Sequence, residues 1–210
     1  MQINFPLDDN GMWREIRVPP DEICPRPGLF IDRDGTIIEL VNYLSNPSDV
    51  CPIDDAITLI VEACYKNIPV IMVTNQSGIG RGYYDWEAFS KVQAAVIDIV
   101  AKVGGAIHGI YACSALPESN SYCRKPNPGM IFAGAEDLAI DLPNSWIVGD
   151  TANDLLAGKR AGLKNGWLVK TGYGQKERKK ALTLSNKNFD VITNQPLTEL
   201  SCLLPTCGKL

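Results

Sequence analysis

Two aspartates near the start of the sequence stand where carboxylates can do phosphate chemistry. In "FIDRDGTI", Asp32 follows a short apolar stretch, and Asp34 precedes a glycine that permits a sharp reversal of the chain. One carboxylate can attack phosphorus as a covalent nucleophile, and a second can protonate the leaving oxygen and later deprotonate water. Taken alone, the Asp-x-Asp-Gly run fits a simple turn better, because Asp and Gly are common turn residues.

A second pair of aspartates favours a catalytic role over a simple turn. In "SWIVGDTANDLL", Asp150 ends another apolar stretch and Asp154 follows one helical turn later. Carboxylates that share a crevice repel one another and any phosphate unless a cation lies between them, and Mg²⁺ suits such oxygen ligands. We therefore predict that Asp150 binds Mg²⁺ together with Asp32 and Asp34. Asp154 fits a metal site and a helix-capping role equally well.

Two further segments offer groups that bind phosphate. Thr74 and Asn75 end the apolar run "IPVIMVTN", and a glycine-rich loop follows whose N–H groups could cradle phosphoryl oxygens. This loop is not a P-loop, and a plain turn into a helix at residue 85 would also explain it. In "SYCRKPNPGM", prolines stiffen the chain around Arg124 and Lys125. An exposed Arg-Lys pair normally only faces water, but a pair held in this way can offset the charge of a transferring phosphoryl group.

Apolar runs and helical periodicities alternate along the chain and must position these groups. The pattern predicts the following strands: 28–32, 68–75, 107–114, 145–150, 166–170 and 189–193. It predicts these helices: 54–67, 85–105, 128–140, 153–162 and 197–204. The apolar face expected of the helix 85–105 consists of Val92, Val96, Ile99, Val100 and Val103. The basic segment 171–188 is expected to be a solvated loop or helix.

This alternation predicts an α/β fold with a Rossmann-like, mostly parallel sheet covered by helices on both faces. Ligands of such sheets bind beyond the carboxyl ends of the strands. The polar groups described above follow predicted strands, so we expect them to meet at one edge. Residues 28–210 are expected to form this domain, and residues 1–27, which carry five prolines and little periodicity, an extension packed on it.

The composition limits the classes of molecule that the protein is expected to bind. The 210 residues are 45% hydrophobic and carry a net charge of −4, which argues against a broad nucleic-acid or membrane surface. We expect a small-molecule substrate, no nucleic acid, no membrane and a monomer. The acidic, interrupted N-terminal stretch does not read as a signal peptide, and seven scattered cysteines favour a reducing cytoplasm. The single histidine, His108, is expected in a loop and argues against histidine-based sites.

Four runs, "DRDGTI", "VTNQSGIGRGYY", "CRKPNPGM" and "VGD", resemble in this order the haloacid dehalogenase (HAD) superfamily of phosphohydrolases. The resemblance is closer still to the branch of D-glycero-D-manno-heptose 1,7-bisphosphate phosphatases and histidinol phosphatases. It implies a HAD fold without a large cap domain, and it implies that Asp32 is the nucleophile and Asp34 the general acid/base.

The resemblance also implies further roles. Mg²⁺ would lie between Asp32, the backbone carbonyl of Asp34, and Asp150. Thr74, Arg124 and Lys125 would stabilise the phosphoryl group.

Three departures from this branch bear on metal and substrate. Relatives often bind structural zinc through a Cys-x-His and a Cys-x-Cys pair, but here only Cys113 and Cys123 remain, with Ala115 and Ser121 at the other positions. A structural zinc site needs four protein ligands, so we predict that the protein binds no zinc. We also predict that Cys123 is a packed residue and that it forms no disulfide with Cys113. The Asp-His-Gly-Tyr of the heptose enzymes is replaced by residues 40–43, Leu-Val-Asn-Tyr, and a lysine of the family is replaced by Thr151.

These observations predict a Mg²⁺-dependent phosphomonoesterase that acts through an aspartyl phosphate on a small phosphorylated metabolite, with D-glycero-D-manno-heptose 1,7-bisphosphate as first candidate. Histidinol phosphate, another sugar phosphate and a polynucleotide 3′-phosphate are the alternative substrates. A signalling receiver module would also form an aspartyl phosphate, but it has no use for an acid/base at Asp34. A phosphate-binding relic is the remaining alternative, and the complete set of reactive groups disfavours it.

Overall fold

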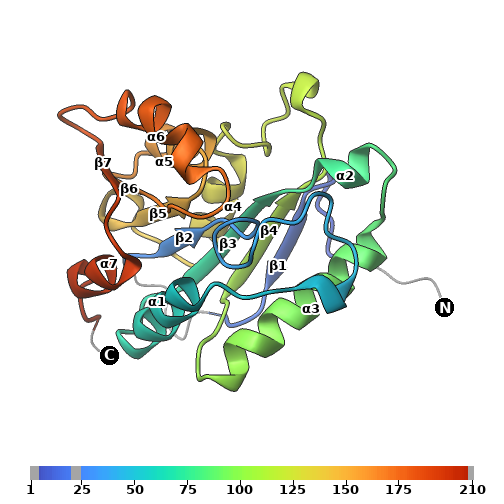
Figure 1. Ribbon diagram of the computed structural model, residues 1–210, viewed down its shortest axis with the longest axis horizontal. Helices are drawn as coiled ribbons and strands as arrows, with labels where there is room; N and C mark the ends of the chain where they lie inside the picture. The colour runs from blue at the N-terminus through green and yellow to red at the C-terminus, as the bar shows by residue number, and fades with distance from the viewer. Residues whose placement is uncertain (1–4, 20–24, 208–210) are drawn as a thin grey trace.

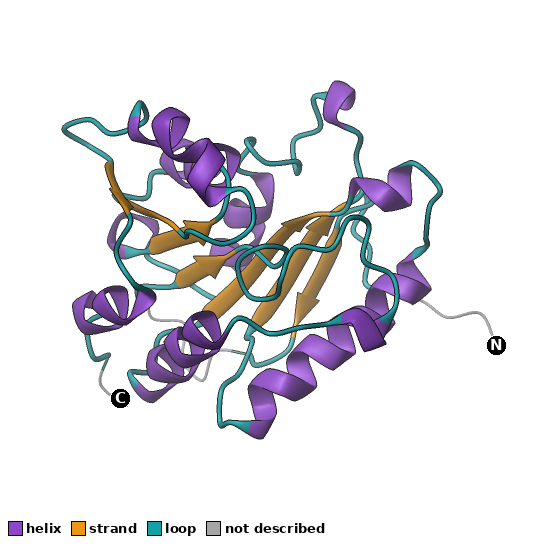
Figure 2. Cartoon of the chain, in the orientation of Figure 1, coloured by secondary structure: helices purple, strands orange, loops and turns teal. Residues whose placement is uncertain are grey.

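The computed structural model describes residues 5–19 and 25–207. In this part of the chain seven strands form one sheet in the order β1-β4-β3-β2-β5-β6-β7 (Figure 1). Their bounds are β1 Trp13–Ile16, β2 Leu29–Ile31, β3 Val70–Asn75, β4 Gly109–Cys113, β5 Trp146–Gly149, β6 Asn165–Leu168 and β7 Asp190–Thr193. All neighbours are parallel except β1, whose arrow runs against that of β4 (Figure 2).

Helices cover both faces of the sheet. One face is covered by α1 (Asp54–Tyr65), α3 (Trp86–Lys102) and α7 (Leu197–Leu203). The other face is covered by α4 (Gly129–Asp137), α5 (Ala152–Ala161) and α6 (Gly174–Leu182). The short α2 (Ser77–Gly80) follows β3, and 3₁₀ turns lie at Pro47–Asp49, Pro117–Ser119 and Leu142–Asn144.

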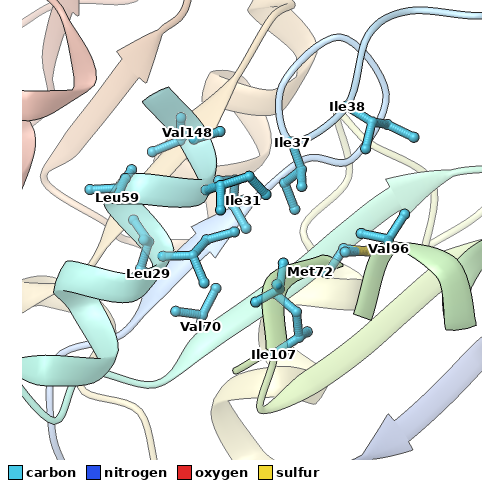
Figure 3. Packing of buried hydrophobic residues seen from close by; sticks show 14 of the residues in the cluster. Leu29, Ile31, Ile37, Ile38, Leu59, Val70, Met72, Val96, Ile107 and Val148 are labelled. Carbon is cyan, nitrogen blue, oxygen red and sulfur yellow. The ribbon is translucent and has the colours of Figure 1, made fainter. Parts of the chain in front are cut away.

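The strands feed two apolar cores, because successive side chains of a strand point to opposite faces. Leu29 and Ile31 of β2 pack with Val70 and Met72 of β3 on the α1 and α3 side (Figure 3). Phe30, between them in the sequence, belongs to the core under α4 and α5. Burial on both faces explains why these strands read as continuous apolar runs.

The predicted fold class is confirmed: the sheet is mostly parallel and helices lie on both of its faces. One prediction of detail was wrong. Val103 does not belong to the buried face of α3, since it follows the last helical residue and is 55% exposed. The turn before α3 also contains the short helix α2.

The N-terminal segment contributes a strand that the sequence did not reveal. β1 pairs with β4 from Trp13 opposite Ala112 to Ile16 opposite Gly109. Trp13 is buried and its ring packs against those of Trp86 and Phe89. Residues 5–19 therefore close one edge of the sheet.

Within residues 5–19 and 25–207, none of the helices has the length and apolar character that crossing a membrane would take.

Candidate active site

A cavity of about 520 Å³ opens at the carboxyl edge of the sheet. Its walls come from the segments that follow β2, β3 and β5 and from the loop before α4. All the residues that the sequence singled out for catalysis, phosphate or metal line this one cavity: Asp32, Asp34, Thr74, Asn75, Arg124, Lys125 and Asp150. Asp154, for which two roles were open, lines it as well.

Lys125 is the central cation of the cavity. Its Nζ lies 2.6 Å from Asp32 Oδ1 and 2.6 Å from Asp154 Oδ1, and it donates to the carbonyl oxygen of Val73 at 2.7 Å. All three hydrogens of the ammonium group therefore have acceptors. Burial opposes the charge, but the carboxylates of Asp154 and Asp32 outweigh it and raise the pKa of Lys125 above its usual value. The lysine is held in the charged form.

Three buried carboxylates meet beside this lysine. Oxygens of Asp32, Asp150 and Asp154 all lie within 4.8 Å of one another. Burial is the main cause that raises the pKa of Asp32 well above its ordinary value and that of Asp150 to about 7. One lysine does not neutralise three carboxylates, and oxygen-rich clusters of this kind suit a hard divalent cation. The donor set therefore fits a metal ion.

Among the described residues, the carboxylate of Asp34 is not one of the three that meet within 4.8 Å. Its oxygens accept from the Arg33 guanidinium at 3.0 to 3.2 Å and from Gln76 Nε2 at 2.8 Å. The hydroxyl of Thr74 lies 3.5 Å from Asp34 Oδ2. In the described residues no N–H donates to the main-chain carbonyl of Asp34. The side chain thus faces a hydrogen-bonding network, while the main-chain oxygen stays available as a ligand.

The remaining predicted groups shape the loop that carries Lys125. Asn75 clamps the main chain of Lys125 with two bonds of 3.1 Å, one donated by Asn75 Nδ2 and one accepted by its Oδ1. Arg124 donates to the carbonyl oxygen of Ala115 at 2.8 Å and still lines the cavity. Asn75 therefore positions the lysine, and Arg124 offers a second cation beside it.

Comparison with known proteins agrees with this geometry. Residues 122–195 match the HAD-hydrolase-like family. A D-glycero-beta-D-manno-heptose-1,7-bisphosphate 7-phosphatase of Mesorhizobium japonicum is 42% identical over 176 residues, which cover 78% of this chain and 79% of that protein. The chain belongs to this family of HAD-like phosphatases. A D-glycero-alpha-D-manno-heptose-1,7-bisphosphate 7-phosphatase of Photorhabdus laumondii is 34% identical over 77% of this chain and 92% of its own length.

Solved structures of HAD phosphatases share the fold. One from Mesorhizobium loti, described as HAD-like, has a TM-score of 0.81 at 34% identity and covers 95% of each chain. The D,D-heptose 1,7-bisphosphate phosphatase of B. bronchiseptica, complexed with magnesium and phosphate, has a TM-score of 0.74 at 28% identity and covers 84% of this chain and 97% of its own. The predicted HAD fold without a large cap, and the predicted phosphatase class, are confirmed.

In this HAD phosphatase the two remaining cysteines of the zinc pattern pack together. Cys113 and Cys123 are buried free thiols, and Ser121 Oγ lies 3.2 Å from Cys123 Sγ. A hydrogen bond with Cys113 is the main cause that lowers the pKa of Cys123 to about 7. The prediction that Cys123 is a packed residue is confirmed, and the prediction of no zinc stays a prediction.

Sequence reasoning missed two groups of the HAD site, Arg33 and Gln76. Both contact the Asp34 carboxylate, and both are buried. Their only signal was position: Arg33 lies between the two aspartates, and Gln76 follows Thr74 by two residues.

Proposed function

We propose that the protein removes the 7-phosphate of D-glycero-β-D-manno-heptose 1,7-bisphosphate, with Mg²⁺ as cofactor. The observation that carries this proposal is the convergence of Asp32, Lys125 and Asp150 with Asp34 in one open cavity. The identity of the substrate comes from the relatives, among which the 42% identical phosphatase is named for the β anomer. The phosphatase named for the α anomer is 34% identical.

Asp32 is the nucleophile of the proposed reaction. One carboxylate oxygen attacks phosphorus, an aspartyl phosphate forms, and the bond to the sugar oxygen breaks. Lys125, 2.6 Å from Asp32, offsets negative charge on the transferring phosphoryl group, and Arg124 and the Thr74 hydroxyl provide further donors. Asn75 keeps the lysine loop in place.

Asp34 is the general acid and then the general base. It gives a proton to the sugar oxygen as that group leaves, and it later takes a proton from the water that attacks the aspartyl phosphate. The second attack releases inorganic phosphate and restores the Asp32 carboxylate. Asp34 is placed for both roles because it lines the same cavity as the nucleophile Asp32.

The metal ligands proposed for Mg²⁺ are Asp32, the main-chain carbonyl of Asp34, and Asp150. When bound, the ion offsets the charge of the carboxylates and of the phosphate. Asp154 is assigned a different task, because both of its oxygens are engaged. Oδ1 contacts Lys125 at 2.6 Å, and Oδ2 accepts from the N–H and the hydroxyl of Thr151 at 2.9 and 2.6 Å. Asp154 therefore orients the lysine.

We assign sugar recognition to residues 40–43 and Thr151, where this chain departs from the pattern of the heptose phosphatases. Leu40, Val41, Asn42 and Tyr43 all line the cavity, and Thr151 does so as well. A substrate whose phosphate lies at Asp32 would extend its sugar past these side chains. We assign them to the selection of the leaving group.

The proposal also covers the domain organisation, the oligomeric state and the location of the enzyme. We take residues 28–210 as one phosphatase domain and residues 1–27 as its extension, supported by the pairing of β1 with β4. We also propose that the enzyme works as a monomer in the cytoplasm, where its thiols stay reduced.

The test is phosphate release from both heptose bisphosphate anomers, histidinol phosphate and a 3′-phosphorylated oligonucleotide, each with Mg²⁺ and with EDTA. We expect the β anomer to be turned over fastest, only with Mg²⁺, and not by Asp32→Asn. The matched control Asp98→Asn, which changes an exposed aspartate of α3, should behave as wild type. Preference for another substrate, or folded protein that is silent on both anomers, would overturn the assignment.

A further inference from the structure

The Asp34 carboxylate is held from two sides by side chains to which the proposed mechanism gives no role. On one side, Nε and Nη2 of Arg33 donate to both carboxylate oxygens at 3.0 to 3.2 Å. On the other side, Nε2 of Gln76 donates to Oδ2 at 2.8 Å. A carboxylate with donors on two sides has little freedom to rotate.

Arg33 is itself fixed. Only 1% of the residue is exposed, its Nη1 donates to Gln93 Oε1 at 3.2 Å, and its guanidinium lies 5.3 Å from the centre of the Phe89 ring. In the described residues its salt-bridge partner is Asp34. Burying a guanidinium is costly without a partner, so the ion pair and the aromatic face hold Arg33 in one place.

Gln76 is fixed through Tyr84. The amide nitrogen of Gln76 donates to Asp34 and to Thr74 Oγ1, both at 2.8 Å, while its Oε1 accepts from the Tyr84 hydroxyl at 2.5 Å. A flipped amide would place its oxygen against the Asp34 carboxylate. Burial raises the pKa of Tyr84 to about 12, so the hydroxyl keeps the proton that it donates.

We propose that Arg33, Gln76 and Tyr84 form a positioning network that sets the direction in which Asp34 exchanges protons with the leaving group. The inference rests on the proposed role of Asp34 as general acid/base and adds the residues that orient its carboxylate. Asp34 transfers its proton to the sugar oxygen while the phosphorus–oxygen bond breaks, and that transfer depends on alignment.

This geometry gives a readout that a purely structural role would not change. An alkyl alcohol is a poor leaving group and needs the proton, whereas p-nitrophenolate leaves without it. Loss of alignment at Asp34 must therefore slow release of the sugar and spare release of p-nitrophenolate, whereas the later attack of water on the aspartyl phosphate, which needs Asp34 as base, is slowed for both substrates alike.

The test measures KM and the rate of leaving-group release in a single turnover, a step that precedes the attack of water, for heptose 1,7-bisphosphate and for p-nitrophenyl phosphate in Gln76→Met and Tyr84→Phe. We expect release from the heptose substrate to slow roughly tenfold or more, with KM and release from the aryl phosphate little changed. Tyr84→Phe removes one hydroxyl and keeps the ring, so it tests the network even if Gln76→Met or Arg33→Lys fails to fold. Tyr83→Phe is the matched control, because that exposed tyrosine does not line the cavity.

Asp34→Asn separates the two claims. If Asp34 is the acid, this variant shows the same selectivity for leaving groups, and adding Gln76→Met to it causes no further loss on the heptose substrate. If Asp34→Asn discriminates between the substrates and the network variants do not, the network is wrong and the mechanism stands. If Asp34→Asn slows leaving-group release from both substrates equally, its role as acid fails and the network fails with it.

Discussion

Asp150 fits its place because two glycines leave room for it. Gly35 and Gly172 both have left-handed backbone angles, φ of +81° and +55°, and a Cβ on either would collide with the Asp150 carboxylate. Tyr173, the residue after Gly172, donates its N–H to Asp150 Oδ2 at 2.8 Å. The position of the proposed metal ligand is thus set by backbone that approaches from two loops.

Gly172→Ala should therefore weaken the metal site as well as the fold. The matched control is Gly104→Ala, whose φ is +86° but which has nothing within 4 Å of the added Cβ. Both variants should lose about 1 to 2 kcal/mol of stability from left-handed strain, and Gly172→Ala should lose more, because its Cβ also collides with the Asp150 carboxylate. Only Gly172→Ala should need more Mg²⁺ for half-maximal phosphate release. A wild-type Mg²⁺ dependence in that variant would show that the loop does not set Asp150.

At the scale of elements, the start of α5 ties the helix to the site. The Thr151 side chain caps α5 by accepting from the Asp154 N–H, and the Asp154 carboxylate accepts from the Thr151 N–H at 2.9 Å. These two bonds form a capping box. The second oxygen of Asp154 contacts Lys125. The cap of one helix thereby orients the cation that faces the nucleophile.

Thr151→Ala should uncouple these roles. Loss of an N-cap costs about 1 kcal/mol, and Asp85→Ala, which removes the cap of α3, should cost a similar amount. Thr151→Ala should also lower kcat, because Asp154 then holds Lys125 less firmly. Thr151→Ser, which keeps the hydroxyl, should restore activity. The comparison needs urea unfolding and steady-state kinetics, and equal kcat in Thr151→Ala and Asp85→Ala would contradict the coupling.

The sequence predicted those elements whose signal is local. β2, β3 and β5 contain continuous apolar runs, and the run in each is followed by the polar residue that serves the site, so Asp32, Thr74 and Asp150 could be found together. β1 could not be found, because "WREI" is short and pairs with a strand almost a hundred residues later. Arg33 and Gln76 were not predicted for a related reason. Their role depends on their contact with the Asp34 carboxylate, and only the folded structure shows that contact.

At the scale of the whole molecule, His108 links folding to pH. It precedes β4, as its predicted loop position implied, and its Nδ1 accepts from the Val70 N–H at 3.1 Å. Burial, aided by the charge of Arg26, lowers the pKa of His108 to about 4. The folded protein thus keeps this imidazole neutral to a lower pH than the unfolded chain, whose histidine titrates near about 6.5.

Between these two values the unfolded chain binds more protons at His108, so the contribution of His108 to the free energy of unfolding falls as the pH drops from about 6.5 to about 4. The full shift corresponds to about 3 kcal/mol. His108→Asn offers the Val70 N–H an acceptor that does not titrate, so its stability relative to that of the wild type should rise as the pH falls over this range. Urea unfolding across the range measures the difference. Identical curves for variant and wild type would remove His108 as the cause.

The central claim is that Asp32 carries the phosphoryl group during turnover. A single turnover of heptose 1,7-bisphosphate with Mg²⁺, quenched and reduced with borohydride, converts an aspartyl phosphate to homoserine, which peptide mass mapping locates. The account predicts homoserine at position 32 in the wild type and none in Asp32→Asn. Turnover that leaves Asp32 unmodified in the quenched wild type, or homoserine at another aspartate, would contradict it.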